Sequence, residues 1–205
     1  MEKKKKRYGI MGGTFDPIHT GHLVVAEEVR QEFNLDKVIF MPTGDPPHKS
    51  SKEVALGQYR YEMTLLATVT NPFFEVSRLE LDRKGTTYTI DTMITLKEKY
   101  KDDVEFYFIT GADSLLELHT WKDSDKILEL CKIVAATRPG YDLGDMEERL
   151  KELNEDNKES INTITTPGLQ ISSTDIRHRV KNGMTIKYLL PESVEVYIEK
   201  YKLYK

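Results

Sequence analysis

A chain of 205 residues with 39% hydrophobic and 31% charged side chains can bury one substantial core and does not require two, so we expect a single domain over residues 1–205. Its formal net charge of -4 argues against a protein that holds duplex nucleic acid on a broad basic face, because neutralised phosphates supply most of that affinity. The single cysteine, Cys131, and the lack of any apolar run of about eighteen residues predict a cytoplasmic protein without disulfides or membrane spans.

Short apolar runs alternate with segments of helical periodicity along the chain. The first half predicts a strand at residues 8–11, a helix at 23–33, a strand at 37–41, a loop at 42–52, a helix at 58–70, a strand at 73–81 and a helix at 88–100. The second half predicts a strand at 104–110, a helix at 126–130, a strand at 133–136, an exposed helix running into a loop at 142–158, a strand at 161–165, and helices that begin near Ser173 and Pro191. This alternation favours an α/β fold, a Rossmann-like open and mainly parallel sheet with helices on both faces.

The segment between the first strand and the first helix carries the strongest chemical signal. It combines two adjacent glycines with a short loop and two histidines three positions apart: Gly12, Gly13, Thr14, Phe15, Asp16, His19 and His22. Ligands of parallel sheets bind beyond the carboxyl ends of the strands, and a helix that begins there offers its N–H groups to phosphate. The two histidines would project from the first helical turn and donate hydrogen bonds to a phosphoryl group as its negative charge grows.

Two other interpretations of this segment stay open. The histidine pair could hold zinc, although no third ligand of convincing spacing accompanies it, or the turn could be a structural helix cap. The segment does not match the G-x-G-x-x-G pattern of dinucleotide dehydrogenases, and the chain has no G-x-x-x-x-G-K-[ST] phosphate loop. Hydride transfer and kinase-type chemistry therefore both lose support.

A second phosphate-binding signal lies at the helix expected near Ser173. Three consecutive hydroxyl residues stand at the helix start and an arginine follows one turn later: Ser172, Ser173, Thr174 and Arg177. Hydroxyls, helix N–H groups and a guanidinium can together form a phosphate cradle. Plain capping is the alternative, because Ser172 and Asp175 stand at capping-box spacing.

Three more residues are candidates for contacts with a nucleotide. Trp121, the single tryptophan, lies in a polar stretch where an indole could be partly exposed and stack on a flat heteroaromatic ring, although a lone tryptophan is more often a core residue. Asp113 follows the strand expected at 104–110, where it could accept ribose hydroxyls or cap a helix. Arg138 precedes a proline turn and could equally be a surface arginine.

The sequence resembles the nicotinate mononucleotide adenylyltransferase family, within the nucleotidyltransferases that carry a His-x-Gly-His signature. The resemblance runs nearly from end to end, through residues 12–23, 41–42, 46–49, 85–92, 111–113, 121, 138–140, 171–177 and 188–191. Departures from the family pattern are mild. Thr87 stands where the family commonly has serine, and Met11 stands where a bulkier or branched apolar residue is common.

The resemblance implies an enzyme of NAD biosynthesis that transfers AMP from ATP to nicotinate mononucleotide, with His19, His22 and Arg177 as catalytic residues. It implies an ATP site formed by Gly12, Gly13, Thr14, Phe15, His19, His22, Lys49, Gly111, Asp113, Arg138, Ser172, Ser173, Thr174 and Arg177. It implies a nicotinate-nucleotide site formed by Asp16, His48, Lys49, Thr86, Thr87, Tyr88 and Trp121, in which the backbone of residues 86–88 contacts the nicotinate carboxylate.

The expected cofactor is Mg²⁺, carried mainly by the ATP phosphates, with no metal site in the protein itself. The expected partners are the two small-molecule substrates, without nucleic acid or membrane, and a homo-oligomer is left open. One alternative is an adenylyltransferase with another acceptor, such as nicotinamide mononucleotide or phosphopantetheine. Another alternative is a regulatory protein that binds nucleotides without turnover, a class in which loss of His19 or His22 would be expected, whereas both are present.

Overall fold

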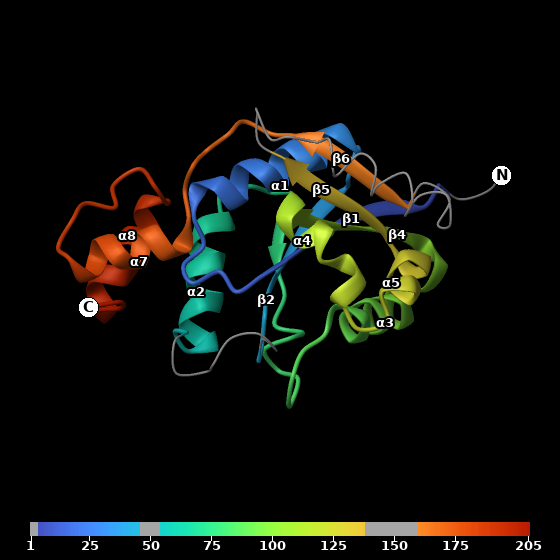
Figure 1. The fold of residues 1–205 in the computed structure, drawn as a ribbon, viewed down its shortest axis with the longest axis horizontal. Coiled ribbons are helices and arrows are strands. Elements are labelled where there is room, and N and C mark those ends of the chain that lie inside the picture. Colours follow the sequence, from blue (N-terminus) through green and yellow to red (C-terminus); the bar gives the residue numbers. More distant parts are fainter. Residues whose placement is uncertain (1–3, 46–53, 138–159) are drawn as a thin grey trace.

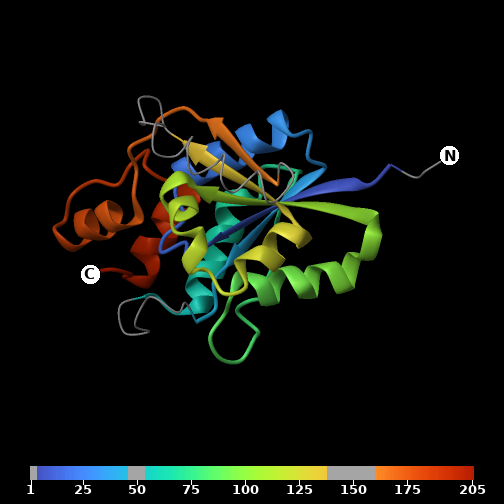
Figure 2. The ribbon, with the colours of Figure 1, turned by 45° about the vertical axis from the view of Figure 1, so that its right-hand side comes forward.

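The computed structural model describes residues 4–45, 54–137 and 160–205, and this part of the chain forms one parallel sheet flanked by helices (Figures 1 and 2). Its six strands lie in the order β3-β2-β1-β4-β5-β6, and every neighbouring pair is parallel. Their bounds are β1 Lys6–Gly13, β2 Lys37–Pro42, β3 Phe74–Val76, β4 Val104–Gly111, β5 Lys132–Thr137 and β6 Ile161–Thr165. The expected fold class, an open parallel α/β sheet, is confirmed.

Helices connect the strands and extend beyond the last one. Their bounds are α1 Thr20–Glu32, α2 Gly57–Thr68, α3 Thr89–Tyr100, α4 Ala112–Leu116, α5 Ser124–Leu130, α7 Ser173–Lys181 and α8 Glu192–Tyr201, with short 3-10 turns at Lys101–Asp103 and Leu118–Thr120. Helices α7 and α8 lie at the opposite end of the molecule from α3 and α5 (Figure 1). Among the described residues, no helix is long and apolar enough to cross a membrane.

Both faces of the sheet are covered because its strands alternate their side chains between two cores. On β1, Ile10 belongs to the core shared with α3 and α5, while Met11 belongs to the core shared with α1, α2 and α8. On β4, Phe108 and Ile109 divide in the same way. Burial on both faces explains why the strands read as nearly continuous apolar runs.

The edge strand β3 is much shorter than the strand expected at residues 73–81. Pairing with β2 ends after Val76, where the N–H of Ser77 donates to the carbonyl of Phe40 at 2.9 Å. The partner position further along β2 is Pro42, which has no N–H to continue the ladder. Leu79, within the expected strand, instead packs from outside β3 against the core shared with α3 and α5.

Most other element predictions hold within a few residues, and β6 has the predicted bounds. Two differences concern the site. Helix α4 was not predicted, because five residues are too few to show a helical period. The predicted helix at 142–158 and most of the predicted loop at 42–52 lie outside the described residues.

Candidate active site

A cavity of about 500 Å³ opens at the carboxyl ends of β1, β4 and β5, between the starts of α1, α4 and α7. Its wall brings together seven residues that the sequence assigned to ATP, although they come from three distant segments: Gly12, His19, His22, Gly111, Asp113, Ser172 and Ser173. Three helix N-termini face this space, which favours a bound anion. The site therefore lies where parallel-sheet proteins bind their ligands.

His19 and His22 form a stacked pair at the start of α1. Their ring centroids are 3.7 Å apart at an interplanar angle of 26°. His19 occupies the N-cap position, and its backbone N–H donates a hydrogen bond to Nδ1 of His22 at 3.2 Å. Because Nδ1 accepts this bond, a neutral His22 carries its proton on Nε2, which leaves that atom as the donor.

The surroundings keep His22 neutral. Burial and, to a smaller extent, the neighbouring His19 hold the pKa of His22 well below its ordinary value of 6.5. A neutral imidazole still donates through Nε2–H, and its hydrogen bond can strengthen as charge develops on a ligand. Within residues 4–45, 54–137 and 160–205, no group of three or more His, Cys, Asp or Glu side chains is placed to hold a metal, so the zinc alternative would need a ligand from outside these ranges.

The Phe15 ring packs against the His22 ring of the histidine pair. The two rings meet edge to face, with centroids 5.1 Å apart, and Phe15 is 2% exposed. A side chain at Gly13 would place a Cβ 2.9 Å from the Phe15 ring, which is too close for carbon atoms. Gly13 is therefore needed to admit the Phe15 ring beside His22. The Phe15 ring takes a core position, and the assigned contact of Phe15 with ATP stays a prediction.

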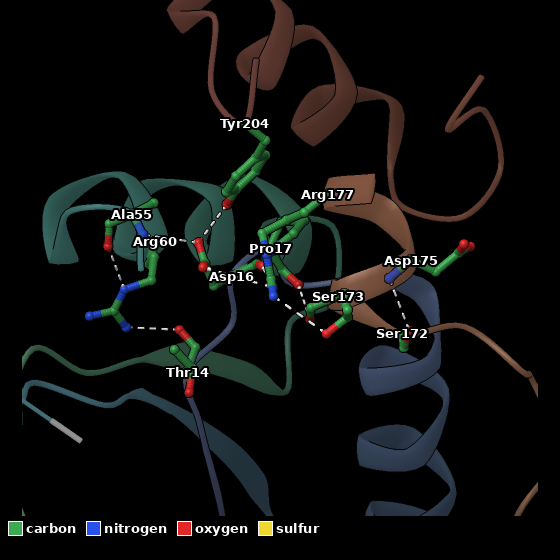
Figure 3. A network of polar contacts seen from close by, with 11 residues as sticks. Thr14, Asp16, Pro17, Ala55, Arg60, Ser172, Ser173, Asp175, Arg177 and Tyr204 are labelled. Carbon is green, nitrogen blue, oxygen red and sulfur yellow. Dashed lines mark hydrogen bonds and ion pairs between the residues drawn. The ribbon is translucent and has the colours of Figure 1, made fainter. Parts of the chain in front are cut away.

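The start of α7 serves as both a cap and a wall of the cavity. Oγ of Ser172 accepts the Asp175 N–H at 3.1 Å, so the capping interpretation is confirmed for this residue. Oγ of Ser173 donates to the carbonyl of Pro17 at 2.9 Å, which joins α7 to the loop of residues 14–19 between β1 and α1, here called the signature loop (Figure 3). Ser172 and Ser173 also line the cavity, and the phosphate-cradle role of residues 172–174 stays a prediction.

Asp16 and Arg177 join the signature loop to α7 from a second side. Nη1 of Arg177 donates to the main-chain carbonyl of Asp16 at 2.7 Å and lies 3.9 Å from Oδ2 of the same residue. Asp16 is 3% exposed, and its Oδ1 accepts hydrogen bonds from the Tyr204 hydroxyl at 2.7 Å and the Ala55 N–H at 3.3 Å. The Asp16 carboxylate thus orients the loop from inside the protein, while its assigned contact with the nicotinate nucleotide stays a prediction.

Arg60 and Tyr204 are parts of this arrangement that the sequence reasoning missed. Arg60, 3% exposed, donates to the carbonyls of Thr14 at 2.8 Å, Ala55 at 3.0 Å and Gly44 at 3.3 Å. The position of Arg60 on the apolar side of the helix predicted at 58–70 could have indicated its role, because a buried cation requires hydrogen-bond partners. Tyr204 stands outside every motif, and the sequence gives no sign of its contact with Asp16.

Trp121 and residues 86–88, which were predicted to bind the pyridine ring, do not line the cavity. Trp121 is half-buried, and its ring meets that of Phe108 edge to face at 5.7 Å. The same Phe108 ring borders Gly12, where an added Cβ would lie 3.3 Å from it. Trp121 is thus partly a core residue, in agreement with the alternative interpretation of a lone tryptophan. The Phe108 ring lies between Trp121 and Gly12.

Residues 86–88 are held by Asp45, which lies in the segment that follows β2. An isolated parallel bridge joins Asp45 to Thr86, and the Thr87 N–H donates to the Asp45 carbonyl at 3.1 Å. The Thr87 N–H is therefore already used, so the predicted contact with a carboxylate depends on the N–H groups of Thr86 and Tyr88. Oγ1 of Thr87 is buried without a hydrogen-bond partner among the described residues.

The remaining assigned residues divide into two groups. Asp113 lies in the first turn of α4, whose N-cap is Gly111, so Asp113 is not the cap and lines the cavity instead. His48, Lys49 and Arg138 lie outside the described residues.

Comparisons with known proteins agree with this geometry. Residues 10–179 match the cytidylyltransferase-like family model. A protein of Thermoanaerobacter sp. (strain X514) named "Probable nicotinate-nucleotide adenylyltransferase" is 58% identical over 203 residues, which cover 99% of this chain and 96% of the relative. A protein of Moorella thermoacetica with the same name is 57% identical over 199 residues, which cover 97% of this chain and 92% of the relative.

A solved structure shows the same fold. The nicotinic acid mononucleotide adenylyltransferase of Plasmodium falciparum, complexed with NaAD, superposes with a TM-score of 0.79 over 97% of each chain at 22% identity. The family model and the two bacterial relatives each cover well over half of the chain. The chain therefore belongs to the cytidylyltransferase-like family and, within it, to the nicotinate-nucleotide adenylyltransferases.

Proposed function

We propose that this chain, as a single nucleotidyltransferase domain in the cytoplasm, joins ATP and nicotinate mononucleotide to give nicotinate adenine dinucleotide and pyrophosphate. The observation that carries this proposal is the stacked His19–His22 pair at the start of α1, on the wall of a cavity that α7 closes with Ser172 and Ser173. The names of the bacterial relatives supply the acceptor.

The reaction is a direct in-line displacement. A phosphate oxygen of the mononucleotide attacks the α-phosphorus of ATP, one P–O bond forms, and the P–O bond to the departing pyrophosphate breaks. The attacking oxygen is already anionic, so no protein nucleophile or general base is needed. The task of the protein is to align two polyanions and to offset charge in the transition state.

The donors for this task come from two helix starts. Nε2–H of His22 points away from the bond that fixes Nδ1, and we assign it to a non-bridging oxygen of the α-phosphate, where charge increases in the transition state. The α7 start and Arg177 would receive the β- and γ-phosphates, because N–H groups, hydroxyls and a guanidinium all bind phosphate oxygens. His19 holds His22 in its tautomer through the backbone bond.

Mg²⁺ fits this site as an ion that is bound mainly to the ATP phosphates and enters with them. Among the described residues that line the cavity, Asp113 is the single carboxylate, which suits a hard cation held mainly by phosphate oxygens and water. When bound, Mg²⁺ would neutralise part of the phosphate charge, and Asp113 could reach it through water.

Pyrophosphate release from ATP tests the proposal, with nicotinate mononucleotide, nicotinamide mononucleotide and phosphopantetheine offered separately and no acceptor as the blank. We expect the highest kcat/KM with nicotinate mononucleotide and no release with phosphopantetheine. Turnover with phosphopantetheine but with neither mononucleotide would show that the enzyme uses a different class of acceptor. Tight ATP binding without pyrophosphate release for any acceptor would favour a regulatory nucleotide-binding protein.

A further inference from the structure

Tyr204, which follows the end of α8, contributes a partly buried hydrogen bond to the signature loop. Its hydroxyl donates to Oδ1 of Asp16 at 2.7 Å (Figure 3). Its ring packs against the core that lies between the sheet and helices α1, α2 and α8. Burial and the Asp16 carboxylate raise the pKa of Tyr204 far above its ordinary value of 10.0, so the phenol keeps its proton and acts as the donor.

The chain is bent to bring Tyr204 to this position. Lys202 and Tyr204 both adopt left-handed backbone conformations, with φ angles of 52° and 65°. Side chains other than glycine pay a steric cost there, and the surrounding packing must hold them. Leu203, between them, is buried, and its N–H donates to the Ile198 carbonyl at 3.0 Å. A strained turn with a buried anchor thus directs one hydroxyl at one carboxylate.

Asp16 relays this contact to Arg177. The main-chain carbonyl of Asp16 accepts from Nη1 of Arg177 at 2.7 Å, while Oδ2 stays 3.9 Å from the same nitrogen. Nη2 of Arg177 lies 3.4 Å from Oγ1 of Thr174. The Arg177 side chain is 31% exposed, so the guanidinium is held at one edge and accessible at another.

We infer that Tyr204 is a positioning residue for adenylyl transfer, which acts through Asp16 to keep Arg177 available to the ATP phosphates. The inference rests on the proposed function. With the Tyr204 hydroxyl on Oδ1, the carboxylate is satisfied and need not form a close pair with Arg177. Without that hydroxyl, the buried Asp16 retains only the 3.3 Å bond from the Ala55 N–H on its Oδ1. An undersatisfied buried carboxylate draws the guanidinium to itself and so competes with phosphate.

Removing the hydroxyl alone tests the inference. Tyr204→Phe should raise the ATP Kd, measured by calorimetry with MgATP and no acceptor, about fivefold to tenfold, the scale of one ordinary hydrogen bond, because the lost bond acts on ATP only through Arg177. The KM for ATP should rise in parallel, while the KM for nicotinate mononucleotide stays within about twofold of wild type. Tyr201→Phe removes a hydroxyl from the exposed side of α8 and serves as the matched control, with both constants unchanged.

A double-mutant cycle separates positioning from general structural support. In an Arg177→Ala background, Tyr204→Phe should produce no further change in the ATP Kd, because its effect passes through the missing guanidinium. An equal rise in both backgrounds would contradict the inference, as would an unchanged Kd in Tyr204→Phe. A variant that no longer gives a cooperative melt would show that the hydroxyl is structural instead. If wild type releases no pyrophosphate, the proposed function fails, while the calorimetric cycle still decides the role of Tyr204.

Discussion

His19 donates its backbone N–H to Nδ1 of His22 while the two imidazole rings stack 3.7 Å apart. One contact fixes the tautomer of His22 and the other fixes its plane, so the two residues act as a donor and its support. Burial is the main cause that lowers the pKa of His22, and the neighbouring His19 lowers it further, so protonation of His22 is disfavoured. The pair thus presents an uncharged, oriented N–H to the cavity.

Acceptor choice should favour nicotinate over nicotinamide mononucleotide by at least about tenfold in kcat/KM, which corresponds to about 1.4 kcal/mol. Backbone N–H groups at Thr86 and Tyr88 can donate to a carboxylate, whereas the NH2 of an amide would find no matching acceptor. Steady-state kinetics with each acceptor at saturating MgATP measures the ratio, with Thr87→Ser as a control that keeps the hydroxyl. Equal efficiencies would refute the assignment of this pocket.

Trp121→Ala should raise the KM for nicotinate mononucleotide at least about fivefold and change kcat less, because the pyridine ring lies far from the reacting phosphorus. The KM for ATP should change little. Trp121→Phe, which keeps an aromatic face, should recover part of the loss. Since Trp121 also contacts Phe108, a thermal melt is needed alongside. Collapse of Trp121→Ala at ordinary temperature, with normal acceptor KM in Trp121→Phe, would mark Trp121 as a core residue only.

Glu80 should make the protein less stable as the pH rises. The side chain is 7% exposed, and burial raises its pKa from 4.5 to about 7, against the opposing effects of the Thr92 hydroxyl and Arg83. The folded state therefore holds a proton that the unfolded state releases above pH 4.5. The free energy of unfolding should fall between about pH 4.5 and 7, by at most about 3 kcal/mol.

Glu80→Gln tests that expectation, because glutamine keeps the shape and can still accept the 2.8 Å hydrogen bond from Thr92. Urea unfolding at several pH values should show a flatter profile for Glu80→Gln than for wild type. The exposed Glu98→Gln, on the same helix as Thr92, should leave the profile unchanged. Identical profiles for Glu80→Gln and wild type would rule out a buried, protonated Glu80.

The fold was largely predictable because both cores leave a periodic record in the sequence. Strands buried on two faces read as apolar runs, and helices α1, α2 and α3 carry apolar stripes at helical spacing. The prediction was wrong at residues 77–81, where Leu79 packs against the core from outside the strand after Pro42 ends the ladder. It also missed α4, whose five residues show no period.

The site was predictable only in its linear motifs. The signature loop and the α7 start could be found because each places its residues within a few positions of one another, and the cavity brings both together. The contact between Asp16 and Tyr204 spans 188 positions, and no local pattern reports it. The burial of Asp16 and Phe15 likewise follows from packing between segments distant in the sequence.

The turnover of His22→Ala tests the central claim most directly. The variant should melt like wild type and bind MgATP with nearly the same Kd, while its kcat falls about a hundredfold or more, because the Nε2–H donor acts mainly on the transition state. His178→Ala, an exposed histidine on α7, is the matched control and should keep wild-type kcat. Metal analysis of the same preparations addresses the zinc alternative, which requires stoichiometric zinc in wild type that is lost with activity in His22→Ala. A well-folded His22→Ala protein with near-normal kcat would contradict the account.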